Sequence, residues 1–276
     1  MPDATEFTIE LSAGPFRLLR WDGEGVPALL LHGLTGLAEV WTPAAQALAG
    51  GRGLMAMDQR GHGDSPAPAD GYDIERFVDD LAEAVKALGF ERPHLVGHSM
   101  GARVAMVAAA RRPELFRSVA VVDIGPEAWE ENWRETVAGI ERMPESFTRE
   151  ESLTFFTRNR PTPSERLALY LVRLREGADG RLSWRGSPEA WKTTVVSHRS
   201  RDFWADWEAL SLPALLIRGG SSNELRPEVA TEMRTRNPGV AYLELPGIGH
   251  NVPLLAPEQL AEALAAFWSS VESPGS

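Results

Sequence analysis

The sequence contains no cysteine, which excludes disulfides, thiolate metal sites and a cysteine nucleophile. It also lacks an apolar run of about 18 residues, the length that a membrane-spanning helix requires. Residues 1–14 begin acidic and do not show the basic and then apolar pattern of a signal peptide. We therefore expect a cytoplasmic protein with no membrane partner.

Basic residues are also too few to attract polyanions. The 28 Lys and Arg are outnumbered by 39 Asp and Glu, the formal net charge is −11, and no dense Lys/Arg block offsets it. Because such a surface repels phosphate backbones, we expect no nucleic-acid partner. The expected partner is a small molecule, and the chain is expected to be a monomer or a small homo-oligomer.

The order of apolar runs predicts an α/β fold. The chain has 276 residues, enough to bury a sizeable core, and 43% of them are apolar. Short β-rich runs alternate with longer helical patterns, which is typical of a parallel sheet covered by helices on both faces. The predicted strands are Phe7–Leu11 and Phe16–Trp21, which form an edge hairpin, and then Val26–Leu31, Gly53–Met57, His94–Val96 and Ser118–Val122. The predicted helices lie near residues 39–48, 74–89 and 100–111.

The pattern changes after Asp123. For about 85 residues strand-like runs are missing and Trp, Arg and Glu recur at helical spacing. The tryptophans of this segment are expected mostly to pack between helices, with a few facing a cavity. The sheet pattern resumes with a strand at Pro213–Ile217, a helix near 226–236, a strand at Val240–Leu245 and a helix near 256–269. We therefore predict a core domain of residues 1–123 and 210–276 and a helical cap, or lid, of residues 124–209.

A Gly-x-Ser-x-Gly motif, with Ser99 at its centre, lies between a predicted strand and a helix of small residues. This is the context in which the motif indicates a nucleophile elbow. A strand that turns at once into a helix strains the serine backbone, and the residues two positions to either side, Gly97 and Gly101, must be small to avoid collision. The turn lifts the Ser99 hydroxyl clear of the sheet and directs the Met100 N–H, at the helix start, toward a developing oxyanion.

Together with His32-Gly33 after an early strand and the stretch Asp58–Ser65 after the next, this elbow resembles the α/β-hydrolase family, in particular its small serine esterase-like members with a helical lid. The resemblance covers nearly the whole chain. It implies a mostly parallel α/β-hydrolase sheet flanked by helices, with a helical cap inserted after the sixth strand. It also implies that the Leu34 N–H is the second oxyanion donor and that no metal or organic cofactor is needed. Arg60 and Asp64 are interpreted as structural ion-pair or turn residues.

His250 is the predicted general base. It follows the last predicted strand, where the family carries its catalytic histidine. A serine hydroxyl needs a neighbour with a pKa near about 7 to accept its proton. His94 and His98 flank the elbow in a strand that must be buried and His198 lies in the insertion, so we interpret these as structural or pocket-lining residues.

The acid of the triad is not marked by the usual motif. In most relatives it follows the strand after the lid, but Arg218–Leu225 contains no aspartate. Asn223 stands near that position, and its neutral amide would not stabilise an imidazolium. Asp123 should emerge at the same edge of the sheet as Ser99, and a subset of small esterases in the family carries its acid there. We assign Asp123 as the acid and keep Glu224 as the alternative; for Asp123, a structural role as cap of the first lid helix also stays open.

The leading functional hypothesis is hydrolysis of a small carboxylic ester, or of a thioester or lactone, through an acyl-Ser99 intermediate. Carbon–carbon bond hydrolysis and cofactor-free perhydrolysis or oxygenation use similar residues and stay open as alternatives. A strongly anionic substrate would need lid arginines in the pocket, such as Arg173, Arg199 or Arg201. A ligand receptor that has kept the fold is the non-enzymatic alternative. Haloalkane dehalogenation and epoxide opening are disfavoured because they need an aspartate where Ser99 stands.

Overall fold

The computed structural model describes residues 4–48, 51–158 and 162–273. The central sheet of this part consists of β1 (Thr5–Leu11), β2 (Gly14–Trp21), β3 (Ala28–Leu31), β4 (Leu54–Met57), β5 (His94–His98), β6 (Ser118–Val122), β10 (Ala214–Gly219) and β11 (Ala241–Leu245). Its strand order is β1-β2-β4-β3-β5-β6-β10-β11. β1 and β2 form an antiparallel hairpin at the edge, β2 is antiparallel to β4, and the other neighbours are parallel. The predicted mostly parallel α/β fold and its edge hairpin are therefore confirmed.

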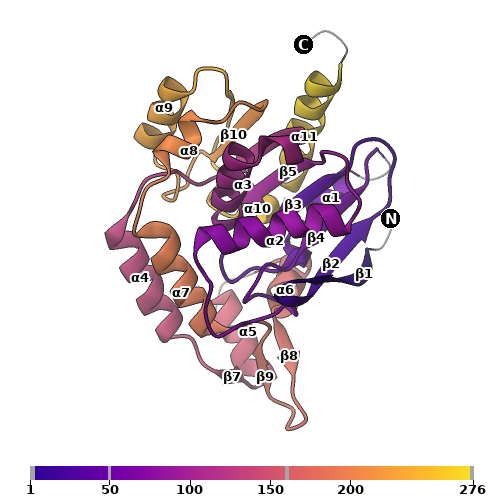
Figure 1. The fold of residues 1–276 in the computed structure, drawn as a ribbon. Coiled ribbons are helices and arrows are strands. Elements are labelled where there is room, and N and C mark those ends of the chain that lie inside the picture. The colour runs from indigo at the N-terminus through magenta and orange to yellow at the C-terminus, as the bar shows by residue number, and fades with distance from the viewer. Residues whose placement is uncertain (1–3, 49–50, 159–161, 274–276) are drawn as a thin grey trace.

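The central strands β3, β5 and β6 are buried along their whole length because both faces of the sheet are covered. In β3, Leu29 and Leu31 pack into one hydrophobic cluster, whereas Ala28 and Leu30 pack into the other. The first cluster includes residues of α2 (Ile74–Ala87), α3 (Met100–Arg111), α8 (Trp204–Glu208) and α9 (Pro227–Arg236). The second includes residues of α1 (Thr42–Ala47), α10 (Val252–Leu255) and α11 (Pro257–Glu272). The sheet thus lies between two helical layers (Figure 1).

Between β6 and β10 the chain leaves the core and forms a further group of elements (Figure 1). These are α4 (Glu130–Glu141), β7 (Ser146–Phe147), α5 (Arg149–Thr157), α6 (Ser164–Leu171), β8 (Leu174–Glu176), β9 (Leu182–Trp184) and α7 (Pro188–Arg199). The prediction that strands are missing from this insertion is wrong, because β7, β9 and β8 form a small antiparallel sheet. With two or three residues each, these strands are too short to produce a periodic pattern.

One of the predicted helices is divided in the structure, and a short helix that was not predicted precedes another. The helix expected near 39–48 begins as a 3-10 helix (Ala38–Trp41) and continues as α1, which has a proline in its first turn. Before α11, the four residues of α10 form a helix of their own, and a proline begins α11 as well. Proline suits these positions because its missing N–H would have no helical partner there. Another 3-10 helix (Pro113–Leu115) connects α3 to β6.

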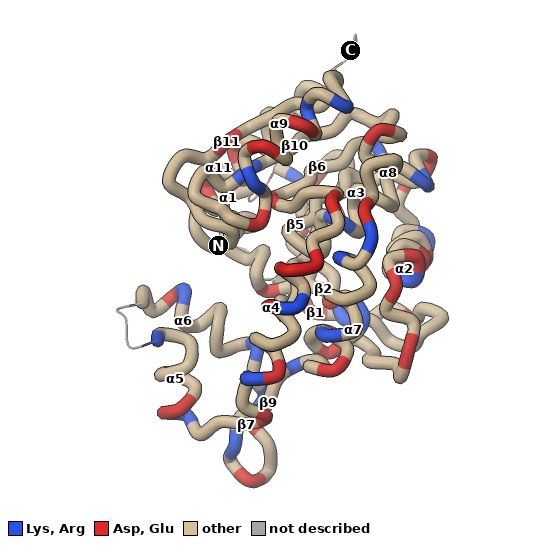
Figure 2. The backbone as a smooth tube through the Cα atoms, turned by 90° about the vertical axis from the view of Figure 1, so that its left-hand side faces the viewer, with Lys and Arg blue, Asp and Glu red and all other residues tan. Residues whose placement is uncertain are grey.

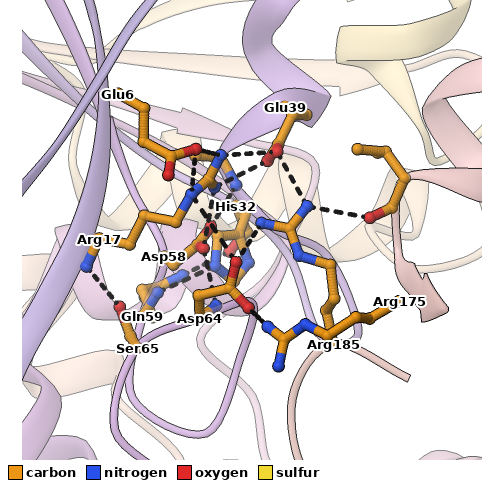
Figure 3. A network of polar contacts seen from close by, with 12 residues as sticks. Glu6, Arg17, His32, Glu39, Asp58, Gln59, Asp64, Ser65, Arg175 and Arg185 are labelled. Carbon is orange, nitrogen blue, oxygen red and sulfur yellow. Dashed lines mark hydrogen bonds and ion pairs between the residues drawn. The ribbon is translucent and has the colours of Figure 1, made fainter. Parts of the chain in front are cut away.

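An ion-pair network joins the small sheet of the insertion to the core (Figure 3). Arg185, which follows β9, donates to Glu39 Oε1 at 3.1 Å and to Asp64 Oδ2 at 2.6 Å. Arg17 of β2 donates to the same Glu39 at 2.8 Å and to the fully buried Asp58 at 3.0 Å. Because the two arginines share Glu39, the insertion and the first strands of the core are held by one set of paired charges.

Charges elsewhere in the described chain are also mostly paired. Arg60 donates to both oxygens of the buried Asp80 at 2.6 Å, and Asp64 pairs with Arg185. Both residues therefore form structural ion pairs, as predicted. Figure 2 shows basic and acidic residues interspersed along the backbone rather than gathered in one long basic stretch. Within the described residues, none of the helices combines the length and hydrophobicity needed to cross a bilayer.

Burial keeps most of the histidines neutral. The buried ones are His32, His62, His94, His98 and His198. For each of them burial is the largest cause of a lowered pKa, to about 4 for His62 and His94 and to about 3 for His98 and His198, while the pKa of His32 lies well below its ordinary value. These side chains therefore remain uncharged at pH values where a histidine of the unfolded chain binds a proton.

We predict that the free energy of unfolding falls as the pH is lowered from about 7 to about 5. Below the ordinary histidine pKa of 6.5 the unfolded chain takes up protons that the folded protein does not. The contribution of these histidines to the free energy of unfolding is therefore fully present above that pH and is lost as the pH falls toward 4. Each such histidine contributes a loss of about 2 kcal/mol at pH 5. Urea unfolding at the two pH values measures the loss.

The matched variant is His198→Met. Both ring nitrogens of His198 lack a hydrogen-bond partner in the described structure, so the substitution removes a titrating group without breaking a hydrogen bond. The pH-dependent loss should shrink by about 2 kcal/mol in this variant. A loss as large as that of the unmodified chain would contradict the prediction.

Candidate active site

The backbone turns sharply between β5 and α3. The strand ends one residue before Ser99 and the helix begins one residue after it, so Ser99 alone makes the turn, with a φ of 54° and a ψ of −121°. Its N–H donates to Val122 O in β6 at 2.9 Å, which ties the turn to the neighbouring strand. A non-glycine residue at positive φ is strained, and such strain persists only where the surrounding structure enforces it.

Glycines on both sides make this turn possible. A Cβ on Gly97 would lie 2.2 Å from the carbonyl oxygen of Gly101. A Cβ on Gly101 would lie 2.5 Å from the carbonyl oxygens of both Leu31 and His32 at the end of β3. All three distances are shorter than any van der Waals contact, so both positions require glycine.

His250 lies beside this turn, in the loop that follows β11. Its Nε2 is 2.9 Å from Ser99 Oγ, and its Nδ1 is 2.7 Å from Asp123 Oδ2. Because a carboxylate accepts from Nδ1–H, the proton is assigned to Nδ1 and Nε2 is free to accept from the serine hydroxyl. His98 Nε2 donates to the backbone oxygen of His250 at 2.8 Å, and the two rings lie 4.8 Å apart. The structure therefore brings Ser99, His250 and Asp123 together in one row.

Asp123 is fully buried at the end of β6, with a positive φ of 58°. Besides His250, its carboxylate accepts from the Gly219 N–H at 2.8 Å and from the Ser222 hydroxyl. Three donors thus satisfy a buried charge that would otherwise be costly. Ser222 was not identified from the sequence. A serine in this loop belongs to no motif, and only the folded chain shows that it lies beside Asp123.

In the described structure the loop after β10 does not supply an acid that hydrogen-bonds to His250. Asn223 is exposed to solvent. Glu224 accepts instead from Arg199 at 2.9 Å and from Asn132 at 3.3 Å. Burial would raise the pKa of Glu224, but the charges of Arg199 and His250 together with these hydrogen bonds hold it below its ordinary value. Glu224 therefore forms an ion pair with the insertion.

Two backbone N–H groups are free near the serine. In the described chain no hydrogen bond uses the N–H of Leu34 or of Met100. The loop that carries Leu34 is held by His32, whose Nδ1–H donates to Gly33 O at 2.8 Å and whose Nε2 accepts from a backbone N–H at 3.0 Å. A Cβ on Gly33 would lie 3.0 Å from Ser99 Cβ, so this loop passes directly against the serine.

A model of the alpha/beta hydrolase fold family matches residues 27–257. The chain belongs to the α/β-hydrolase fold family. The match includes Ser99, Asp123 and His250, and it extends through the whole insertion.

Individual relatives agree with this assignment. The chain is 29% identical over 251 residues to a 2-(acetamidomethylene)succinate hydrolase of Mesorhizobium japonicum, with 90% of each chain covered. It is 31% identical over 265 residues to an esterase of Mycobacterium tuberculosis, with 91% of this chain and 86% of the relative covered. A crystal structure of an E-2-(acetamidomethylene)succinate hydrolase matches with a TM-score of 0.90 and 26% identity, over 96% of this chain and 99% of the other.

A cavity with a volume of about 280 Å³ opens at the turn that carries Ser99. Core loops contribute Leu34, Ser99 and His250, and the insertion contributes Tyr170, Arg173 and Arg199, among others. No tryptophan of the described residues lines this cavity, so the expectation that a few tryptophans face it is wrong. Two tryptophans of the insertion, Trp191 and Trp207, are fully buried, and their indole N–H groups donate to backbone oxygens. The other four, Trp129, Trp133, Trp184 and Trp204, are half-buried.

Three arginines of the insertion, expected to serve an anionic substrate, differ in position. Arg173 and Arg199 line the cavity, whereas Arg201 is half exposed and pairs with Glu75 at 2.7 Å outside it. Among the residues that the structure describes, no group of three or more His, Asp or Glu side chains could hold a metal ion.

We predict that Gly101→Ala destabilises the protein by at least about 2 kcal/mol, because the new Cβ would overlap backbone atoms that cannot move aside. The matched control is Gly139→Ala in α4, where a Cβ meets nothing within 4 Å. In a helix this change should stabilise by about 0.5–1 kcal/mol. Urea unfolding of both variants measures the difference, and equal stabilities would refute the steric argument.

Proposed function

We propose that this chain is a serine hydrolase that cleaves small carboxylic esters, or thioesters or lactones, through an acyl intermediate on Ser99. The observation that carries the proposal is the unbroken row of hydrogen bonds from Asp123 through His250 to Ser99 Oγ. In this row a carboxylate orients the imidazole, so that Nε2 faces the hydroxyl as a base. Asp123 is the proposed acid of the triad rather than Glu224, which is engaged with Arg199.

In the first half of the reaction, Ser99 Oγ attacks the carbonyl carbon while its proton passes to His250 Nε2. The carbonyl oxygen becomes an anion, for which the free N–H groups of Leu34 and Met100 are the proposed donors. When the bond to the leaving group breaks, the alcohol or thiol departs with the proton held by His250. The acyl group then remains on Ser99.

In the second half, a water molecule attacks the acyl carbon and gives its proton to His250 Nε2. The bond to Ser99 Oγ breaks as that proton passes to the serine oxygen, so that a carboxylic acid leaves and the free enzyme is restored. Asp123 stays ionised throughout and stabilises the imidazolium that forms twice in each cycle.

We further propose that residues 124–209 act as a cap over a core domain of residues 1–123 and 210–276. Support comes from the cavity, which residues of the insertion, such as Tyr170 and Arg199, line together with Ser99 and His250 of the core. A wall of this kind excludes water and selects substrates by shape and charge.

Hydrolysis of a carboxylate-bearing compound is a second candidate function. The relative from Mesorhizobium japonicum is named for a substituted succinate, whereas the relative from Mycobacterium tuberculosis is named an esterase. Both candidates would use the same three residues. A panel of neutral esters, substituted succinates and dienoates, compared by kcat/KM, distinguishes these two and the carbon–carbon bond alternative.

Ser99→Ala should abolish turnover of short p-nitrophenyl esters and labelling by a fluorophosphonate probe, because both require the hydroxyl. The fold should persist, as judged by circular dichroism and urea unfolding. Ser12→Ala is the matched control, since Ser12 is an exposed turn residue bonded to Glu83. Full labelling of Ser99→Ala would discard the mechanism.

Asp123→Asn should lower kcat for the same esters by a factor of about 10³–10⁴, because an amide can hold the wrong imidazole tautomer. Glu224→Gln removes the charge of the alternative acid but leaves the triad hydrogen bonds, and it should lower kcat by less than about tenfold. If Glu224→Gln were the more damaging change, the assignment of the acid would be wrong.

A further inference from the structure

Arg173 occupies the cavity wall without an acidic partner. It lies between α6 and β8, and it lines the same cavity as Ser99 and His250. Its guanidinium stacks over the Tyr170 ring, 5.5 Å from the ring centroid. Apart from this stacking, the guanidinium neither donates a hydrogen bond nor forms an ion pair in the described part of the chain.

Two neighbouring arginines of the insertion form ion pairs. Arg199, in the same cavity, pairs with Glu224 at 2.9 Å, and Arg185 pairs with Glu39 and Asp64. Burial is the largest cause of a lowered pKa of Arg173. The pKa of His98, beside the turn, is lowered mainly by burial, then by His250, and also by the charge of Arg173. An unpaired cation in a half-buried position is unfavourable unless something else supplies the counter-charge.

The backbone of Arg173 is firmly held. Its carbonyl oxygen accepts from the Arg185 N–H at 2.7 Å, and the Arg185 guanidinium donates to Val172 O at 3.0 Å. Arg185 is in turn fixed to the core through Glu39 and Asp64 (Figure 3). The network that joins the insertion to the core therefore also positions the unpaired arginine, and such preorganisation lowers the entropy lost on binding.

We propose that Arg173 is a carboxylate-binding residue and that the substrate carries a carboxylate apart from the bond that is cleaved. This inference rests on the proposed hydrolysis at Ser99. A guanidinium presents a planar fork of donors that matches a carboxylate. Because the charges of Arg199 and Glu224 cancel, Arg173 leaves the cavity with one net positive charge, which suits a single carboxylate better than a phosphate dianion.

Two pairs of esters test which part of the substrate carries this charge. Monomethyl succinate and methyl butyrate differ by a carboxylate on the acyl side, and 4-acetoxybenzoate and p-tolyl acetate differ by one on the leaving group. In at least one pair, the charged ester should have a kcat/KM about tenfold or more above that of its neutral partner.

Arg173→Gln should lower kcat/KM for the preferred charged ester by about 10- to 100-fold, mainly through KM, and should change the value for the neutral partner by less than about threefold. Arg173→Lys, which keeps the charge but loses the planar fork, should retain part of the preference. Arg201→Gln is the matched control, because Arg201 lies outside the cavity, and it should leave both esters unaffected.

Equal losses for the charged and neutral esters in Arg173→Gln would assign a structural role to Arg173 and overturn the proposal. So would a wild-type enzyme without preference in either pair. Calorimetry with succinate on Ser99→Ala, with and without Arg173→Gln, reads the same site without turnover. If no ester is cleaved and Ser99 is not labelled, the proposed hydrolysis fails. The calorimetry tests the carboxylate site separately: loss of succinate binding in Arg173→Gln supports that site, and unchanged binding overturns it.

Discussion

The turn from β5 into α3 is the constraint on which the rest of the site depends, because one residue must join a strand to a helix. The chain can make this turn only where Gly97 and Gly101 let the backbones of the turn and of β3 approach. The turn holds Ser99 in a strained conformation and, among the described residues, leaves the Met100 N–H without a hydrogen-bond partner. A strained residue and an N–H group without a partner both lower the stability of a folded chain. Here both lie at the serine that is hydrogen-bonded to His250.

Parallel strands explain how distant residues reach this point. β5, β6, β10 and β11 are neighbours in the sheet and end at one edge, so the residues that follow them meet there. Asp123 follows β6 and His250 follows β11, while the loop after β10 supplies hydrogen-bond donors to the carboxylate rather than a second acid. The carboxylate thus lies one strand closer to the serine than the loop where the family most often carries it.

The insertion adds charge to a site whose proposed chemistry needs none beyond the triad. Its small sheet is tied to the core by Arg185, which is shared between Glu39 and Asp64 (Figure 3). Arg199 reaches the cavity already neutralised by Glu224, whereas Arg173 reaches it without a counter-charge in the described structure. The insertion thus contributes one positive charge without an ion pair in the described structure to the cavity that Ser99 also lines.

The sequence by itself determined the fold class, the glycine-flanked turn at Ser99 and the position of His250 after the last strand, because each of these depends on a local pattern in strand, turn or helix. It also indicated that Asp123 ends a strand at the correct edge. Only the tertiary structure decided that Ser222 bonds Asp123, that three very short strands form a sheet, and which of the similar-looking lid arginines is unpaired. Those outcomes depend on contacts between residues far apart in the chain, such as Arg185 with Glu39 or Arg199 with Glu224, and no local periodicity encodes the packing that creates such contacts.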